Sequence, residues 1–153
     1  MKRNPPLTLL LVEDEPADAF LIRLAFDEGR VPVTLHHVLD GEEALAFLHN
    51  APPHQAAPMP DLILLDLNLP RMNGRTFLQQ LKSEPRLVQI PVVVLSTSDS
   101  ETDLRTSYSL NAAGYITKPL DVDTYIQMVQ NLYNYWGQTV RLPNIPAQII
   151  RAS

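Results

Sequence analysis

Four short apolar runs in this 153-residue chain each end at side chains that can do chemistry. The run 9–12 is followed by Glu13 and Asp14, the run 62–65 by Asp66, the run 92–95 by Ser96, and the segment 114–117 by Lys118. If these runs are parallel buried strands, their carboxyl ends meet at one edge of a sheet, where open α/β sheets bind ligands. Three carboxylates, a hydroxyl and an ammonium at one edge suit a divalent cation beside a phosphorylatable aspartate.

The three acidic residues predict a divalent cation site. Each has a structural explanation by itself, because Asp66 can begin a turn and Glu13 or Asp14 can cap a helix. Three converging carboxylates repel one another, however, and a hard cation removes that repulsion. Mg²⁺ fits, with Mn²⁺ as an alternative, because it prefers oxygen ligands and retains waters. We expect Asp14 and Asp66 to bind directly, Glu13 through water, and a backbone carbonyl just after Asp66 to complete the set.

Lys118 and Ser96 add a cation and a hydroxyl to the same edge. Lys118 is the only basic residue between Arg105 and Arg141. An ammonium there can neutralise a carboxylate at rest and a phosphoryl oxygen later, and the hydroxyl of Ser96 can donate to a phosphoryl oxygen. The competing structural explanations are a solvated lysine in a turn and a serine that caps the next helix.

The elements that must position these residues alternate between strand-like and helix-like segments, which predicts a parallel sheet with helices on both faces. Strands are expected over 8–12, 33–38, 62–65, 92–95 and near 115, and helices over 16–28, 42–48, 75–82, 101–110 and 121–136. The helical spacing of Ala17, Phe20, Leu21, Leu24 and Ala25 predicts the buried face of the first helix.

Composition excludes several classes of protein. The chain has no cysteine, so disulfides and thiolate metal sites are excluded. The net charge of −5 and the scattered lysines and arginines disfavour direct binding of nucleic acid. No stretch approaches the roughly 20 apolar residues of a membrane span, and the first apolar run is too short for a signal peptide. These patterns predict a cytoplasmic protein without a membrane contact.

Five motifs together resemble the receiver domain of two-component response regulators. They are LLVEDE (10–15), LLDLNLP (64–70), NG (73–74), LST (95–97) and YITKPL (115–120). The resemblance covers about residues 7–136 and implies a flavodoxin-like (βα)5 doubly wound parallel sheet with strand order 2-1-3-4-5. We therefore divide the chain into a receiver domain, 1–136, and a tail, 137–153, that docks on its own domain or on a dimer partner.

The resemblance also implies a role for each site residue. Asp66 would accept a phosphoryl group from a phosphohistidine on a sensor histidine kinase. Asp14, Asp66 and the backbone carbonyl of Asn68 would bind Mg²⁺, with Glu13 at the paired-acid position. Such a protein promotes only its own phosphorylation and dephosphorylation, so it is not an enzyme with a separate product.

Three further residues of the resemblance concern the response to phosphorylation. Lys118 would contact the phosphoryl group, Ser96 would be the switch hydroxyl and Tyr115 the switch aromatic. The family's Lys–Pro bond is typically cis, so the Lys118–Pro119 bond is expected to be cis.

The segments YNYW (133–136) and TVRLP (139–143) resemble the endings of small regulators that partner phytochrome-type kinases in cyanobacteria and other bacteria. Two alternatives stay open: a phosphorelay intermediate, and a receiver-like interaction module that never takes phosphate. A haloacid-dehalogenase-type phosphatase would need a second aspartate where Asn68 stands. A flavin or nucleotide binder would need a glycine-rich loop, which the chain lacks.

The last expected helix is apolar over more than one face and carries no lysine or arginine. One face packs on the sheet, and the remainder exceeds what a solvated helix shows. This excess predicts a homodimer contact or a cover from the tail. Candidate dimer residues are Tyr125, Ile126, Val129, Tyr133 and Trp136.

Overall fold

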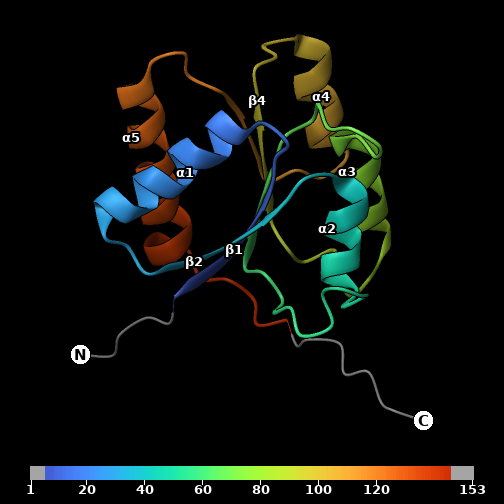
Figure 1. Ribbon diagram of the computed structural model, residues 1–153. Coiled ribbons are helices and arrows are strands. Elements are labelled where there is room, and N and C mark those ends of the chain that lie inside the picture. Colours follow the sequence, from blue (N-terminus) through green and yellow to red (C-terminus); the bar gives the residue numbers. More distant parts are fainter. Residues whose placement is uncertain (1–5, 146–153) are drawn as a thin grey trace.

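Five strands alternate with five α helices in residues 6–145, the part of the chain that the computed structural model describes (Figure 1). The strands are β1 (Leu7–Val12), β2 (Val33–Val38), β3 (Leu62–Leu65), β4 (Val92–Ser96) and β5 (Gly114–Thr117). The helices are α1 (Pro16–Gly29), α2 (Gly41–Leu48), α3 (Gly74–Ser83), α4 (Glu101–Ser109) and α5 (Val122–Tyr133), and α5 continues into a π-helical turn, η1 (Asn134–Thr139).

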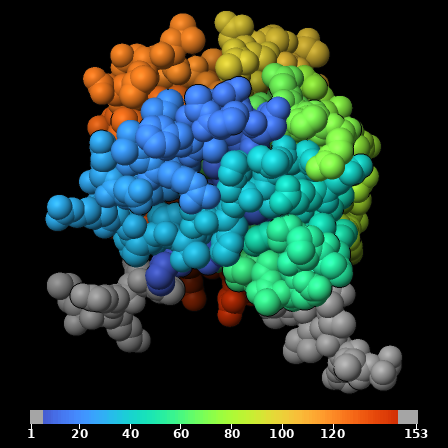
Figure 2. Space-filling model, in the orientation of Figure 1, coloured from blue at the N-terminus to red at the C-terminus, as the bar shows by residue number. Residues whose placement is uncertain are grey.

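The sheet is parallel throughout, with the order β2-β1-β3-β4-β5. Helices α1 and α5 cover one face, and α2, α3 and α4 lie on the other (Figure 1). In the space-filling view from the same side, α1 and the segment from β2 to the loop after α2 form an almost continuous surface over the strands (Figure 2). The predicted flavodoxin-like fold and strand order are confirmed.

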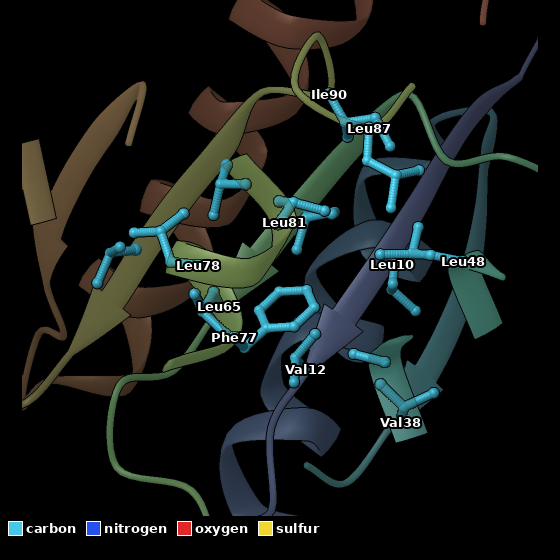
Figure 3. Packing of buried hydrophobic residues seen from close by; sticks show 14 of the residues in the cluster. Leu10, Val12, Val38, Leu48, Leu65, Phe77, Leu78, Leu81, Leu87 and Ile90 are labelled. Atoms are coloured by element: carbon cyan, nitrogen blue, oxygen red, sulfur yellow. The ribbon is translucent and has the colours of Figure 1, made fainter. Parts of the chain in front are cut away.

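Strand alternation divides the core between the two faces of the sheet. In β1, Leu10 and Val12 pack with α2 and α3, where Phe77 is central (Figure 3). Leu9 and Leu11 point to the opposite face, toward α1 and α5. Because helices cover both faces of the central strands, the sequences of these strands are continuous apolar runs. Such runs are easy to recognise, so the strands could be predicted from the sequence.

The buried face of α1 differs from the expected one. Ala19, Ile22, Ala25 and Phe26 are buried, whereas Phe20 is 62% exposed. The prediction was right for Ala25, which is buried, and wrong for Ala17 and Phe20, which are exposed, because apolar residues occur on more than one side of this helix. Packing against both the sheet and α5 selects the side that carries Ile22 and Phe26.

The end of α5 also departs from the expected helix over 121–136. The α-helical part ends at Tyr133, and the wider turn η1 follows, closed by the Val140 N–H donating to the Tyr135 carbonyl. Beyond it, Leu142 packs on the core of the α1 face and Ile145 on the core of the α2 face. The rest of the predicted tail, 146–153, lies outside the described residues.

No helix in the described part of the chain is both long enough and apolar enough to cross a membrane.

Candidate functional site

The carboxyl ends of the central strands bring the candidate residues to one place. The Asp66 N–H donates to the Val12 carbonyl, so Asp66 lies beside the end of β1. The Lys118 N–H donates to the Ser96 carbonyl, which places Lys118 beside the end of β4. Backbone pairing therefore gathers side chains that are far apart in sequence, as the sequence pattern predicts.

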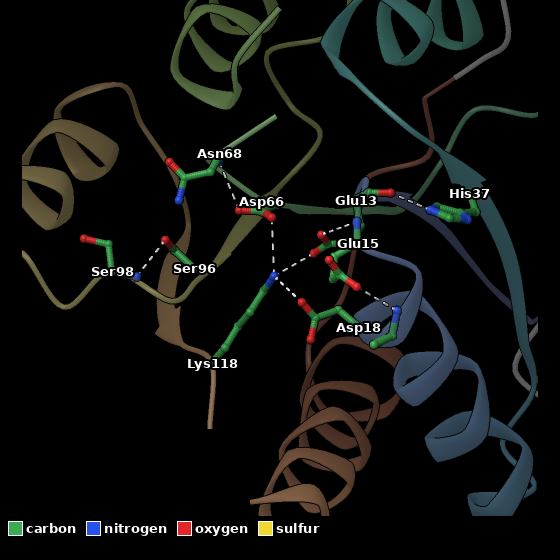
Figure 4. Close-up of polar contacts among 10 residues, drawn as sticks. Glu13, Glu15, Asp18, His37, Asp66, Asn68, Ser96, Ser98 and Lys118 are labelled. Atoms are coloured by element: carbon green, nitrogen blue, oxygen red, sulfur yellow. Dashed lines mark hydrogen bonds and ion pairs between the residues drawn. The ribbon is translucent and has the colours of Figure 1, made fainter. Parts of the chain in front are cut away.

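The ammonium of Lys118 lies at the centre of the cluster (Figure 4). Its Nζ atom is 2.8 Å from Glu13 Oε2, 2.9 Å from Asp18 Oδ2 and 3.3 Å from Asp66 Oδ2. The Lys118 side chain is only 5% exposed. A solvated lysine in a turn is therefore excluded, because this side chain is buried among carboxylates.

Asp18 is the functional-site residue that the sequence analysis missed. It lies in the first turn of α1, one helical turn after Asp14. Helical side chains lean toward the N-terminus of their helix, and here that end faces the site. The signal was present in the sequence as an acid in the first turn of a helix that follows an acidic strand end.

Glu13, Asp14 and Asp66 can each offer a carboxylate oxygen to a common point, with those oxygens all within 4.8 Å of one another. Glu13 and Asp66 are buried, and Asp14 is exposed. Oxygens at this spacing, one of them open to solvent, match the preference of Mg²⁺ or Mn²⁺ for a few carboxylates and retained waters.

The ionisation of the cluster favours a cation as well. Burial is the main cause that raises the pKa of Glu13 from 4.5 to about 7, with Lys118 opposing the shift and the charge of Asp66 adding to it. Burial lowers the pKa of Lys118, but the ion pairs with Glu13 and Asp18 outweigh it and hold this pKa above its usual value. One ammonium leaves Glu13 incompletely compensated, so the residues present fit a divalent cation.

The loop after β3 holds Asp66 through short contacts. Asp66 Oδ1 accepts the Asn68 N–H at 3.0 Å. Gly74 packs directly beneath, since a Cβ there would lie 2.5 Å from the Asp66 carbonyl oxygen. Asn73 caps α3 by accepting the Thr76 N–H. The Asn73–Gly74 pair thus supports the backbone of the candidate phosphoacceptor.

Ser98 links the two candidate switch residues, Ser96 and Tyr115. Ser96 is fully buried, and its Oγ accepts the Ser98 N–H at 3.1 Å. The Tyr115 hydroxyl donates to the Ser98 carbonyl at 2.8 Å. Within residues 6–145, no hydrogen bond joins Ser96 to Asp66 (Figure 4). The Ser96 oxygen is therefore engaged with the Ser98 backbone and not with Asp66.

The expected cis bond before Pro119 is not found. Pro52–Pro53 is the only cis peptide bond in the described part of the chain, so Lys118–Pro119 is trans and this prediction was wrong. The trans form is the ordinary preference of such bonds, by about 0.5–1 kcal/mol. With this bond trans, the ammonium of Lys118 reaches the acidic cluster.

The candidate dimer residues do not share one free face. Tyr125, Val129 and Tyr133 are buried in the core between α5, α1 and the sheet, so they offer little surface to a dimer partner. Ile126 and Trp136 are only partly buried and pack at the edge of the same core. An α helix on a sheet needs a broad apolar stripe for its own domain, which accounts for much of the apolar excess that the sequence shows.

Comparison with known proteins decides the family. The model of the response regulator receiver domain matches residues 9–130. The chain belongs to this family. Response regulator Rcp1 of Synechocystis sp. is 42% identical to this receiver chain over 140 residues, which are 92% of this chain and 95% of Rcp1.

Solved structures agree with this assignment. The phosphorylated cyanobacterial phytochrome response regulator RcpA matches with a TM-score of 0.87 and 44% identity, covering 91% of this chain and 99% of RcpA. The Mn²⁺-bound form of Rcp1 matches with a TM-score of 0.86 and 41% identity, covering 91% of this chain and 100% of Rcp1. The resemblance to small phytochrome response regulators is confirmed.

Proposed function

We propose that this response regulator accepts a phosphoryl group on Asp66 from a phosphohistidine of a sensor histidine kinase. One observation carries the proposal: the Asp66 carboxylate lies at the sheet edge in contact with the Lys118 ammonium and close to carboxylate oxygens of Glu13 and Asp14. Receiver domains share this function, and RcpA, which is 44% identical, is known in a phosphorylated form.

In the proposed reaction, an Asp66 oxygen attacks phosphorus, a P–O bond forms and the P–N bond of the phosphohistidine breaks. The leaving imidazole takes up a proton from solvent. Such transfer depends on positioning and charge neutralisation more than on acid–base catalysis. Lys118 stabilises the negative oxygens of the phosphoryl group. The chemistry ends with hydrolysis of the acyl phosphate on the same residue, in which water attacks, inorganic phosphate is released and the Asp66 carboxylate is restored.

Glu13, Asp14, Asp66 and the Asn68 carbonyl are the residues that would hold a divalent cation in this proposal. A bound Mg²⁺ or Mn²⁺ supplies positive charge to the phosphoryl oxygens. Support comes from the grouped carboxylate oxygens and from Rcp1, whose structure is known in a Mn²⁺-bound form. Asn68 is exposed in the loop after β3, and its N–H donates to Asp66, so this residue adjoins the carboxylates.

Phosphorylation then changes the surface near α4 and β5. The Ser96 hydroxyl leaves the Ser98 N–H to donate to a phosphoryl oxygen, and Tyr115 exchanges its bond with the Ser98 carbonyl for an inward position. Because both bonds involve Ser98, moving one residue disturbs the other. Phosphorylation thereby shifts a pre-existing equilibrium between two surface states.

The partner proposed for this regulator is a phytochrome-type histidine kinase. Support comes from its similarity to RcpA and Rcp1 along nearly the whole length of both proteins.

A homodimer is the proposed assembly. It would form through those apolar residues of the last helix and its continuation that stay accessible. Ile126 and Trp136 are partly exposed there, and Tyr135 is 52% exposed. A strict monomer in light scattering at high micromolar concentration, with and without phosphorylation, would contradict the dimer.

The test of the function is phosphotransfer from a ³²P-labelled histidine kinase in the presence of Mg²⁺. We expect label on the wild-type protein and none on the Asp66→Asn variant, whose circular dichroism should match the wild type. Asp61→Asn is the matched control, because Asp61 lies just before the opposite end of β3 and its side chain accepts only the Thr8 N–H. Label on Asp66→Asn, or none on the wild type with any phytochrome-type kinase, would contradict the proposal.

A further inference from the structure

Asp18 lies closer to the Lys118 ammonium than Asp66 does. The two Nζ–oxygen distances are 2.9 Å and 3.3 Å. Asp18 is not part of the group of acids whose oxygens converge as cation ligands in the described residues. It comes from α1, and its side chain is 22% exposed at the rim of the site (Figure 4). The nearest charge to the ammonium after Glu13 is therefore a carboxylate with no role in the proposed phosphorylation.

The three carboxylate contacts use all the N–H groups of the ammonium. A lysine ammonium has three donors and no acceptor, and they go to Glu13, Asp18 and Asp66. For Lys118 to contact an incoming phosphoryl oxygen, one of these bonds must lengthen or be shared. Lys118 does not need Asp18 to stay in place, because its side chain is buried and also bonded to Glu13. Asp18 thus competes for the ammonium without being required to position it.

A second donor lies within electrostatic reach of Asp18. The hydroxyl of Tyr125 is buried and has no hydrogen-bond partner within residues 6–145. Burial raises the pKa of Tyr125, and the negative charge of Asp18 adds to that shift. A buried hydroxyl without a partner is costly. The hydroxyl of Tyr125 is thus an unused donor whose ionisation is affected by the charge of Asp18.

We propose that Asp18 slows phosphorylation of Asp66, because its carboxylate holds the Lys118 ammonium toward α1 and places negative charge at the rim where an anionic donor enters. This inference rests on the proposed function and adds a residue that regulates its rate. Asp18 would disfavour small phosphodonors with high negative charge most strongly, because no protein partner offsets their repulsion by this carboxylate.

Two substitutions at Asp18 separate its charge from its contact. Asp18→Asn removes the charge and keeps an oxygen that can accept from Lys118, whereas Asp18→Ala removes both. The control is Asp27→Asn, which makes the same charge change on an exposed residue of the same helix, about 13 Å further along by the rise per residue. Each protein is phosphorylated with acetyl phosphate and with phosphoramidate at saturating Mg²⁺, and the rate is followed by separating the phosphorylated form.

We expect both Asp18 variants to react roughly two- to tenfold faster than wild type with acetyl phosphate. The gain should be smaller with phosphoramidate, a less negative donor near neutral pH, and Asp27→Asn should match wild type with both. A merely structural role for Asp18 would not distinguish the donors. A readout without turnover is the ¹⁵N shift of the Lys118 ammonium, which should change in both Asp18 variants and not in Asp27→Asn.

Two results would overturn the inference. Slower reaction in Asp18→Ala than in wild type would show that Asp18 is needed to position the ammonium. Equal rates for wild type and both variants would show that the contact has no effect on phosphorylation. In either case wild-type protein phosphorylated on Asp66 leaves the proposed function intact. Failure of every form to take up phosphate from either small donor, although each binds Mg²⁺ in calorimetry, would contradict the inference about Asp18, whereas the proposed function is contradicted only if the phosphorylated kinase also fails to label the wild type.

Discussion

Two buried carboxylates at the same edge of the sheet, Asp40 and Glu13, have pKa values that are shifted in opposite directions. Each is only 1% exposed, and each is paired with a basic side chain. Burial alone would raise the pKa of Asp40, but the Glu43 N–H and the guanidinium of Arg71 outweigh it, so this pKa lies below its usual value. Burial prevails at Glu13 and raises its pKa to about 7.

The difference lies in how many donors serve each acid. Asp40 caps α2 through the Glu43 N–H and also accepts two N–H groups of Arg71, a residue whose backbone is left-handed. Glu13 accepts one backbone N–H, from Glu15, and shares one ammonium with Asp18 and Asp66. A satisfied carboxylate stabilises the fold, whereas an unsatisfied group of carboxylates favours a ligand that brings positive charge. Asp40 thus belongs to the scaffold, and Glu13 to the reactive site.

Removing the shared cation should have the largest effect. Lys118→Met leaves buried acids without a partner, so we expect the free energy of unfolding to fall by about 3–5 kcal/mol without divalent cation. Mg²⁺ should restore part of the loss by taking over the acids. Urea unfolding with and without Mg²⁺ measures both. The control is Lys82→Met, because Lys82 bonds only the carbonyls of Val88 and Ile90 and Mg²⁺ should not help it. Equal responses of the two variants to Mg²⁺ would contradict the account of Lys118.

Neutralising the scaffold acid should destabilise the protein less. Asp40→Asn keeps an N-cap for α2 but loses the ion pair with Arg71, so we expect a loss of about 1–3 kcal/mol at neutral pH. Because the pKa of Asp40 is lowered in the folded state, its contribution exists above the unfolded value of 3.8 and disappears as the pH falls below it. The matched control is Asp121→Asn, an exposed N-cap of α5 without a cation, which should be neutral. If Asp40→Asn and the wild type had the same free energy of unfolding at pH 7, the stabilising role of Asp40 would be contradicted.

Neutralising the reactive-site acid should have the opposite sign and the smallest size. The folded-state pKa of Glu13 is raised from 4.5 to about 7, so the protein loses stability as the pH rises through this window. Glu13→Gln should match wild type near pH 4.5 and exceed its stability by about 1–2 kcal/mol at pH 8 without Mg²⁺. Urea unfolding across this range measures the difference. Glu28→Gln, an exposed change on α1, should show no such window. If Glu13→Gln were less stable than the wild type at pH 8, the charge of Glu13 would stabilise the fold as that of Asp40 does, and the account of Glu13 would be contradicted.

The strands and the main acids could be predicted because they obey strong local rules. Buried parallel strands are continuous apolar runs, and the residue after each run lies at the ligand-binding edge. This rule placed Glu13, Asp66 and Lys118 together correctly. The right motifs in the right order then indicated the family.

Other features depend on tertiary packing that the sequence does not express locally. Asp18 joins the site because α1 ends its first turn beside Lys118, and Phe20 is exposed because α5 covers another side of α1. The helix expected over 16–28 also includes Gly29, and Arg30 takes the left-handed conformation at its end. The aromatic ring of Tyr125 is compatible with a surface or a core position, so the sequence does not distinguish the two. The packing of α5 on α1 places Tyr125 in the core.

The most direct test of the central claim is to locate the phosphoryl group chemically. The protein is incubated with Mg²⁺ and a phosphorylated histidine kinase, then reduced with borohydride, which converts an aspartyl phosphate to homoserine, and the peptides are sequenced by mass spectrometry. The account predicts homoserine at position 66 alone, in a reaction that needs the cation. Homoserine at position 14 or 18, or none at any position in a sample that carries phosphate, would contradict it.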